Sequence, residues 1–331
     1  MVKIKLSTPN PDFPLIRQTP GSMGIWGDCT FYINQDIEEC DYWIIYDALS
    51  GTETTKCPRD NVVLFTGEPP TVKKYSKSFI RQFNTIITCH HYINHKNILY
   101  RQQALPWMAG AKYLKNENKW DSKDYKSYND FLETDNRKKD KEISIVISNK
   151  AYTDGHEQRI KFLSRLTETF GKRINLFGRG FNEIEDKFDC MASYKYSIVL
   201  ENCSVNDYWT EKLSDAYLCG SFPIYYGCPN ILDYFPEGSI AKIDIYNIEN
   251  SIDIIKSVIN SDKYEHSMDL LEKAKELVLN KFNLFPSITG LIDELEKRSN
   301  RSDKKDFIKI YPERRYRKLV RKFIDSFLSK R

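Results

Sequence analysis

The sequence predicts an α/β protein with two Rossmann-like domains that face a central cleft. A chain of 331 residues is too long for one ordinary hydrophobic core and has the length of two domains of about 150 residues each. Short apolar runs recur along the chain, separated by turn-rich segments in the first half and by helical segments in the second. Hydrophobic residues make up 40% of the chain and charged residues 29%, which is typical of a globular protein. The expected units are residues 1–140, residues 141–300 and a tail at residues 301–331.

The first half contains three apolar runs that predict buried strands. They are "YWIIYDA" from Tyr42, "NVVLFTGEPP" from Asn61 and "NTIITC" from Asn84, all rich in β-branched or aromatic residues. The segment from Lys115 to Glu142 is instead rich in Lys, Asp and Asn. We therefore expect it to connect the two domains.

The second half predicts strands that alternate with helices. Strands are expected to begin at Ile143, Ile174, Tyr196, Phe222 and Ser239. Helices are expected at about 155–170 and 210–219, with three more after residue 250. Strands that alternate with helices form a parallel sheet through crossover connections. The "FGRG" sequence at 177–180 follows a strand, but its two glycines favour a plain turn over a phosphate loop, so Arg179 is a weaker candidate for a nucleotide pocket.

The cysteines, the apolar segments and the charge distribution indicate what class of protein this is. The eight cysteines form no C-x-x-C pair and several lie in apolar runs, which predicts reduced core thiols. The chain begins without a signal pattern and has no apolar run of about 18 residues, which predicts a cytoplasmic protein. The net charge of +4 is unevenly distributed, since residues 313–331 contribute +6 and the remainder −2. The positive charge is concentrated in the tail.

Glu211 and Lys212 stand where a loop changes into a helix with one apolar face. In open α/β sheets, ligands bind at the carboxyl ends of the strands, where helix N-termini carry a partial positive charge. A Lys at that position can neutralise a phosphate or diphosphate, and a carboxylate can accept hydrogen bonds from ribose hydroxyls. The alternative is a Glu that stabilises the helix dipole beside an exposed Lys. Spacing alone favours this alternative.

The surrounding motifs change that balance. "YKYSIVLEN" followed by "DYWTEKLSDAYLCGSFPIYYGCP" resembles the signature of the α-1,3-fucosyltransferases, glycosyltransferase family 10. Several elements of that signature occur here in the same order and with the same spacing. "LFTGEPP" at 64–70 resembles the acceptor-side strand of the family. "VISNK" with Arg159 resembles its donor-side strand end and phosphate-binding Arg. The resemblance covers roughly Trp26 to Asp244.

The resemblance implies a bacterial-type, inverting GT-B enzyme that transfers L-fucose from GDP-β-L-fucose to a hydroxyl of a glycan. The expected linkage is α-1,3 to N-acetylglucosamine of N-acetyllactosamine-like or surface polysaccharide units. No cofactor is required, and a divalent cation would be non-essential, because cationic side chains replace the metal on the diphosphate. The donor is then the nucleotide sugar GDP-fucose and the acceptor a glycan, for which attachment to a lipid is one option.

The same resemblance implies a role for particular residues. Glu68 would be the general base, Arg159 and Lys212 the diphosphate ligands, and Glu211 a ribose ligand. The further residues implied at the donor site are Asn202, Tyr208, Ser148, Asn149 and Arg179, and those on the acceptor side are Trp26, Asp28, His90 and His91. A zinc site at Cys89, His90, His91 and His95 is disfavoured, because adjacent residues of a strand point to opposite faces.

Departures from the family pattern leave alternatives open. Leu200, Cys203 and Trp209 replace the usual Phe, Ser and Val, and a bulky Trp209 beside Tyr208 could reshape the donor pocket. A different nucleotide-activated deoxysugar is therefore an alternative donor. A binding module without turnover is a further alternative, although such a module has no use for the base Glu68. Nucleic-acid binding through the basic tail is a third, weaker alternative, and nucleic acid is not an expected partner because no base-reading fold is recognised.

The tail after Pro312, "ERRYRKLVRKFIDSFLSKR", predicts a basic amphipathic helix. Its apolar residues recur at i, i+3, i+4 and i+7 from Tyr316, and Arg and Lys residues occupy the opposite face. Such a helix can lie in an anionic membrane surface, where each cation contributes about 1 kcal/mol. The alternative is packing on the protein or on a second copy in a homodimer. The membrane interpretation places the enzyme in the cytoplasm, peripheral to the inner face of the membrane.

Overall fold

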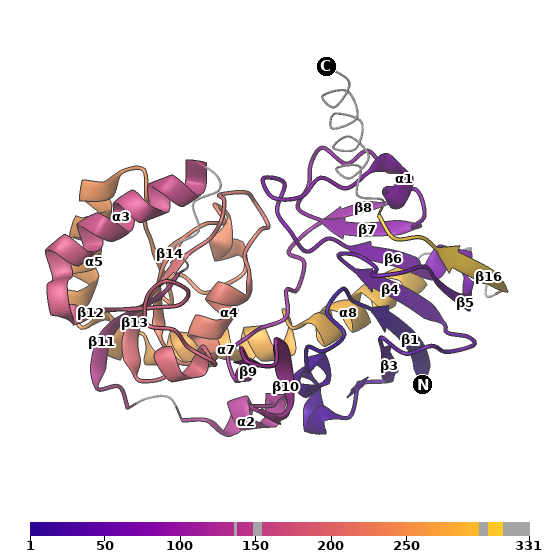
Figure 1. The fold of residues 1–331 in the computed structure, drawn as a ribbon, viewed down its shortest axis with the longest axis horizontal. Helices are drawn as coiled ribbons and strands as arrows, with labels where there is room; N and C mark the ends of the chain where they lie inside the picture. The colour runs from indigo at the N-terminus through magenta and orange to yellow at the C-terminus, as the bar shows by residue number, and fades with distance from the viewer. Residues whose placement is uncertain (136–137, 148–153, 298–303, 314–331) are drawn as a thin grey trace, which may run out of the picture.

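The computed structural model describes residues 1–135, 138–147, 154–297 and 304–313. Two mainly parallel sheets, one from each half of the chain, stand side by side with helices packed around them (Figure 1). This arrangement confirms the α/β prediction of two Rossmann-like units. The predicted C-terminal helix lies outside the described residues.

The first sheet has seven strands in the order β2-β3-β1-β4-β6-β7-β8. All its pairs are parallel except β2 with β3. The strands are β1 (Val2–Ser7), β2 (Ile25–Trp26), β3 (Cys29–Ile33), β4 (Tyr42–Tyr46), β6 (Val62–Phe65), β7 (Thr85–Thr88) and β8 (Ile98–Tyr100). The runs predicted from Tyr42, Asn61 and Asn84 are therefore strands. Alternate residues of β4 enter separate apolar clusters on the two faces, which buries the whole strand.

The second sheet has five parallel strands in the order β12-β11-β13-β14-β15. They are β11 (Lys141–Val146), β12 (Ile174–Phe177), β13 (Tyr194–Leu200), β14 (Phe222–Tyr226) and β15 (Ala241–Lys242). The accompanying helices are α3 (Asp154–Phe170), α4 (Glu211–Leu218), α5 (Ile248–Asn260), α6 (Lys263–His266) and α7 (Met268–Asn280). One continuous apolar cluster joins this sheet to its helices. The alternation predicted from the sequence is present.

Helix α8 (Leu284–Glu296) follows α7 but packs on the first sheet. Its apolar face joins the cluster that also contains Phe31, and the Phe31 and Phe285 rings meet edge to face with centroids 4.8 Å apart. The helix lies within the residues expected to form the second domain, yet its buried contacts are with the first. The first core is thus completed by a distant part of the sequence.

The chain also returns to the first half through β16 (Lys305–Ile310), which pairs with β5 (Glu53–Pro58) in an antiparallel ribbon. Ile308 and Ile310 are buried in the cluster on that side of the first sheet. Beyond the strand, Gln82 and Tyr311 exchange hydrogen bonds of 3.0 and 2.8 Å between side chain and backbone. Residues 305–310, expected to belong to the tail, are therefore a structural strand.

The segment expected to connect the domains has structure of its own. It contains β10 (Lys119–Tyr125), which forms a hairpin with β9 (Ala111–Leu114) just before the segment, and the helix α2 (Tyr128–Glu133). Ser127 caps α2 through a reciprocal capping box with Asp130. The polar composition reflects a hairpin with few buried side chains.

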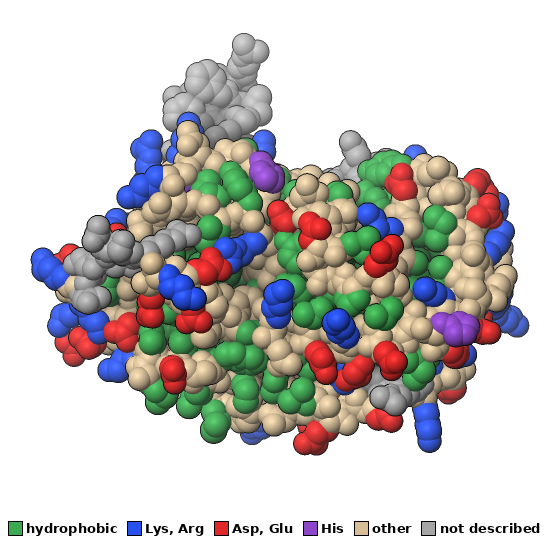
Figure 2. Space-filling view, turned by 180° about the vertical axis from the view of Figure 1, so that it is seen from behind, with side chains coloured by type: hydrophobic (Ala, Val, Ile, Leu, Met, Phe, Trp, Pro, Cys, Tyr) green, Lys and Arg blue, Asp and Glu red, His purple; other side chains and the backbone are tan. Residues whose placement is uncertain are grey.

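The surface and the cysteines agree with a globular chain. All eight cysteines are free and buried, which confirms the predicted core thiols. Lys and Arg side chains are interspersed with Asp and Glu side chains on the face shown in Figure 2. In the part of the chain that the structure describes, no helix combines the length and apolarity needed to cross a bilayer.

The packing of α8 yields a stability prediction. Phe285 is fully buried, so Phe285→Ala should lower the free energy of unfolding by about 3–5 kcal/mol in urea denaturation. The matched control is Phe307→Ala on β16, whose side chain is 71% exposed and should change stability by no more than about 0.5 kcal/mol. Equal effects of the two substitutions would contradict the docking of α8.

Candidate active site

A cleft of about 1060 Å³ separates the two sheets. Its walls include residues that lie within three positions of a strand end: Glu68 after β6, Ile147 after β11, Gly178 after β12 and Asn202 after β13. The carboxyl ends of both sheets therefore face it, as expected for a ligand site in an open α/β fold. The hairpin contributes Ala111, Tyr113, Lys115, Asn118 and Trp120 to the wall.

Glu68 stands on the first-sheet side of the cleft with an exposed side chain. The cleft walls nevertheless bury its carboxyl in part, and this burial raises its pKa, with further contributions from the negative charges of Asp47 and Glu211. A carboxylate that is accessible and has a raised pKa is suited to accept a proton. The position fits the predicted base.

The opposite wall is built around the N-terminus of α4. Thr210 is the N-cap, and its Oγ1 accepts a hydrogen bond of 3.2 Å from the Lys212 backbone N–H. The buried Glu201, directly after β13, accepts from the Thr210 N–H at 2.8 Å and from Lys212 Nζ at 3.3 Å. These contacts fix the first turn of α4 and hold the Lys212 ammonium at the cleft.

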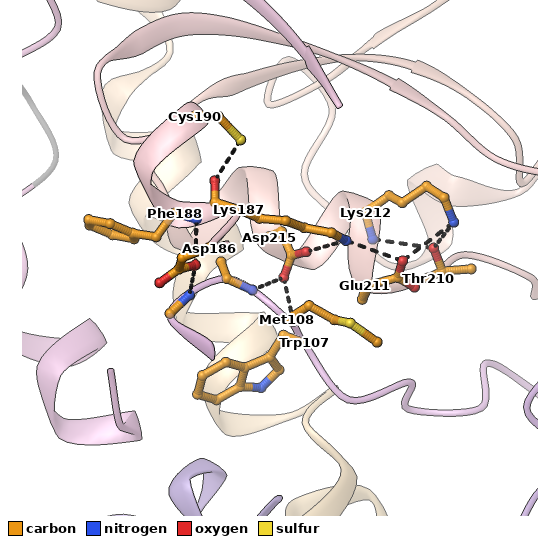
Figure 3. Close-up of polar contacts among 12 residues, drawn as sticks. Trp107, Met108, Asp186, Lys187, Phe188, Cys190, Thr210, Glu211, Lys212 and Asp215 are labelled. Carbon is orange, nitrogen blue, oxygen red and sulfur yellow. Dashed lines mark hydrogen bonds and ion pairs between the residues drawn. The ribbon is translucent and has the colours of Figure 1, made fainter. Parts of the chain in front are cut away.

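Lys187 extends this group toward the segment that joins the sheets (Figure 3). Its Nζ lies between Glu211 Oε1 at 3.3 Å and Asp215 Oδ2 at 3.0 Å. The second oxygen of Asp215 accepts hydrogen bonds of 2.8 Å from the backbone N–H groups of Met108 and Ala109. One ion-pair network thus links the start of α4 to the connecting segment.

Neighbouring charges keep the Glu211 carboxylate and the Lys212 ammonium ionised. Burial opposes the charge on Glu211, but Lys212 and Lys187 outweigh it and lower the Glu211 pKa to about 2. Burial likewise opposes the charge on Lys212, while Glu211 and Glu201 raise its pKa. A charged carboxylate beside a charged ammonium at a helix N-terminus is an arrangement that can bind ribose hydroxyls and a diphosphate.

Arg159 supplies a third cation from α3. Its guanidinium donates a hydrogen bond of 2.8 Å to Asn202 Oδ1, and both residues line the cleft. The side chain is only 6% exposed, and its buried Nε has no partner among the described residues. Arg159 therefore presents a cation at the cleft wall.

The structure brings most of the predicted donor residues together. Five of them line the cleft together with the predicted base Glu68: Arg159, Arg179, Asn202, Glu211 and Lys212. Tyr208 is buried beside it, in a small cluster with Cys89 and Cys203. Ser148 and Asn149 lie outside the described residues.

The predicted acceptor-side residues are more dispersed. Trp26 and Asp28 lie at the β2–β3 edge of the first sheet, where Trp26 contacts Tyr128, and neither lines the cleft. His91 is exposed and stacks on Tyr100, whereas His90 is fully buried and contacts the backbone of Glu68. Within the described ranges, no group of three or more His, Cys, Asp or Glu side chains is placed to hold a metal ion.

Trp209 does not shape the donor pocket, so that expectation was wrong. Its side chain is 2% exposed and packs against Tyr234, Phe235 and Phe282, with ring centroids 5.9, 5.1 and 5.5 Å away. Residues 208 and 209 are neighbours in sequence, but the aromatic cluster draws the Trp209 ring into the core.

Sequence reasoning missed Lys187, Asp215 and the structural role of Glu201. Asp215 offered one signal, because it stands four residues after Glu211 and so shares its helix face. Lys187 lies in a loop, where spacing predicts nothing about its partners. The cleft-lining Trp120 was hidden in a segment that resembles a linker in composition, and Tyr113 lies just before that segment.

Comparison with known proteins agrees with this geometry. Residues 136–277 match the family model described as glycosyltransferase family 10 (fucosyltransferase) C-term. This segment is a family 10 domain. It contains Arg159, Asn202, Glu211 and Lys212, and the predicted resemblance is confirmed there.

Two relatives match parts of the chain. An α-(1,3)-fucosyltransferase of Helicobacter pylori is 35% identical over 78 residues, which are 23% of this chain and 16% of the relative. A 4-galactosyl-N-acetylglucosaminide 3-α-L-fucosyltransferase 9 of Homo sapiens is 31% identical over 114 residues, which are 33% of this chain and 30% of the relative. The matches thus span less than a third of either relative.

A solved structure supports the fold. An α-glucosyltransferase in complex with UDP and a 13-mer DNA is 10% identical, with a TM-score of 0.52 over 89% of this chain and 100% of its own. At this identity the likeness concerns the fold alone, and it agrees with the GT-B type predicted for the family 10 domain and its partner sheet.

The low pKa of Glu211 in the family 10 domain predicts a pH effect on stability. Its folded pKa of about 2 lies below the ordinary value of about 4.3, so its ion pairs stabilise the protein above about pH 4.3 and less as the pH falls toward 2. The difference in unfolding free energy between wild type and Glu211→Gln should therefore be constant above about pH 5 and shrink below it. Urea denaturation from pH 7 to pH 3 measures it.

The control for this prediction is Glu237→Gln, an exposed site away from the cleft. Its difference from wild type should stay near zero throughout. A Glu211→Gln difference that does not change with pH would show that the carboxylate is not held by the two lysines.

Proposed function

We propose that this chain is an inverting glycosyltransferase that transfers L-fucose from GDP-β-L-fucose to a hydroxyl of a glycan acceptor. The observation that carries the proposal is one cleft with Glu68 on the first-sheet side and Arg159, Glu211 and Lys212 on the other. The family 10 match at residues 136–277 and the names of the two fucosyltransferase relatives support the choice of sugar. The proposed acceptor bond is α-1,3 to an N-acetylglucosamine unit.

The chemistry is a single displacement at the anomeric carbon. Glu68 takes the proton of the acceptor hydroxyl while the acceptor oxygen bonds to the anomeric carbon from the face opposite the diphosphate. The bond from that carbon to the phosphate oxygen breaks, and its electron pair leaves with GDP. Attack from the opposite face converts the β-linked donor into an α-linked product. Glu68 thus has one role, the transfer of a single proton.

The donor side stabilises the leaving group. Lys212, Arg159 and the N-terminus of α4 offset the negative charge that develops on the diphosphate, an effect of several kcal/mol in comparable sites. Glu211 stays ionised and accepts hydrogen bonds from the ribose hydroxyls. Asn202 fixes the Arg159 guanidinium through its 2.8 Å hydrogen bond.

A GDP-release assay tests the function. Purified protein should release GDP from GDP-fucose faster when N-acetyllactosamine is present. The same assay with other nucleotide sugars tests the alternative of a different deoxysugar donor, which would keep the mechanism. Absence of release with every donor and acceptor would favour a binding module and overturn the proposal.

The variant that tests the mechanism is Glu68→Gln. Loss of the base should lower acceptor-stimulated release by about 10²- to 10⁴-fold, while the affinity for GDP in calorimetry stays within about twofold. Glu237→Gln is the matched control and should keep wild-type rates, because its side chain is exposed elsewhere. A Glu68→Gln enzyme with a normal rate would remove Glu68 from the mechanism.

We further propose that residues 314–331 bind an anionic membrane surface, which would suit an acceptor linked to lipid. The support is their sequence, which combines a basic face with an apolar face. The described residues before it are attached to the first half of the chain, because β16 pairs with β5 and the Tyr311 N–H donates to Gln82. The enzyme would then work at the inner face of a membrane.

A truncation after Glu313 tests this interaction without removing β16. The full chain should co-sediment with vesicles that contain anionic lipid, and the shortened chain should stay in the supernatant. Vesicles of zwitterionic lipid alone should retain little of either, since each basic residue contributes about 1 kcal/mol only at an anionic surface. Equal behaviour of the two chains would refute the membrane role and favour packing on protein.

A further inference from the structure

Glu68 belongs to a short segment whose backbone is held at two points. The Gly67 N–H donates hydrogen bonds to Asp47 Oδ1 at 3.2 Å and to Tyr75 Oη at 3.0 Å. The Glu68 carbonyl accepts a hydrogen bond of 2.7 Å from His90 Nε2. A side chain at position 67 would have its Cβ 3.0 Å from the Asp47 Cβ, so any residue larger than glycine would force Asp47 to shift by a few tenths of an ångström.

Contacts of both the backbone and the side chain hold Asp47 in place. It follows β4 with a φ of 63°, an uncommon conformation for a residue other than glycine, and its N–H donates a 2.7 Å hydrogen bond to the Phe65 carbonyl. Its Oδ1 also accepts from the Tyr75 hydroxyl, and its Oδ2 pairs with Lys73 Nζ at 3.0 Å. Asp47 is therefore placed to hold Gly67 rather than to meet a ligand, and it does not line the cleft.

His90 is fixed in one protonation state. A carbonyl oxygen only accepts hydrogen bonds, so Nε2 must carry the proton that it donates to Glu68. The Nδ1 atom is buried without a partner among the described residues, and burial lowers the His90 pKa. The ring, packed edge to face against Tyr75 and Tyr92, is thus a neutral donor.

We propose that Asp47 and His90 are positioning residues for Glu68, because they hold the peptide groups on either side of the Gly67–Glu68 pair and so fix the carboxylate in the cleft. This inference rests on the proposed function of Glu68. Neither residue is assigned to contact donor or acceptor. The two act from different strands, since Asp47 follows β4 and His90 follows β7.

Asp47 also affects the ionisation of the base. The charged groups that face Glu68 are Asp47 and Glu211, which raise its pKa beyond the effect of burial, and Lys212 and Lys73, which lower it. Glu68 must be deprotonated to act, so its pKa sets the acid limb of the rate. Removal of the Asp47 charge should lower that pKa and move the acid limb to lower pH.

The main experiment compares Asp47→Asn with wild type in the pH profile of kcat/KM for acceptor-stimulated GDP release. The amide side chain of this variant keeps an oxygen that can accept from Gly67 but lacks the charge, so we expect the acid limb to move to lower pH. Asp12→Asn, an exposed site in the same half, is the matched control and should leave the limb unchanged. An unchanged limb in Asp47→Asn would overturn the electrostatic role of Asp47.

Two more variants test the mechanical role. His90→Ala should lower kcat at least tenfold with little change in the donor KM, and His90→Gln, which keeps an N–H donor, should recover part of the loss. Tyr75→Phe keeps the buried ring and removes the hydroxyl between Asp47 and Gly67, so it should lower kcat severalfold without a shift of the limb. Wild-type kcat in His90→Ala and Tyr75→Phe would overturn the positioning role.

The design separates this inference from the proposed function. An inactive wild type, or a Glu68→Gln variant with normal turnover, would overturn the function and the inference with it. Normal wild-type transfer and an inactive Glu68→Gln, together with unaffected Asp47 and His90 variants, would overturn the inference alone.

GDP affinity by calorimetry shows that each variant retains a folded donor site. The Glu68 pKa measured by ¹³C NMR in wild type and Asp47→Asn gives a readout independent of turnover, and an equal pKa in the two would count against the inference.

Discussion

The cleft depends on the hydrogen bonds and the ion pair of Asp215, which join the two halves of the chain. The buried Asp215 carboxylate accepts from the backbone N–H groups of Met108 and Ala109 and pairs with Lys187, so it attaches the connecting segment to α4. From the other side, Arg17 donates to the Trp107 carbonyl at 2.7 Å. Each buried N–H left without its acceptor would cost about 1–3 kcal/mol. Asp215 and its partners therefore attach the connecting segment to the helix that carries Glu211 and Lys212.

The cleft wall is built from charges that compensate one another. Glu201, Glu211 and Asp215 face Lys187 and Lys212 within 3.0 to 3.5 Å. Buried charges are tolerated when they are paired and hydrogen-bonded, and an unpaired one is costly. The network therefore keeps a lysine ammonium charged and fixed beside the cleft. An anionic ligand would meet an organised site rather than a mobile surface lysine.

Much of the fold could be predicted because its central strands are buried on both faces. Such strands are continuous apolar runs, as in β4 and β6, and α3 and α4 have the periodicity of helices with one apolar face. β1 escaped prediction because "VKIKLS" contains two lysines, of which Lys5 is buried and paired with Glu53 at 3.2 Å. β16 escaped because only Ile308 and Ile310 are buried in an otherwise exposed strand.

The sequence by itself determined where Glu68, Arg159, Glu211 and Lys212 lie relative to strand ends and helix starts, and the family resemblance of its motifs indicated the roles to expect of them. Local patterning is enough to place such residues at the carboxyl edge of a parallel sheet. Only the tertiary structure decided which distant groups surround them: Asp47 and His90 around Glu68, Lys187 beside Glu211, and an aromatic core around Trp209. Those contacts join segments separated by tens of residues, and no spacing along the chain records the side-chain packing that brings them together.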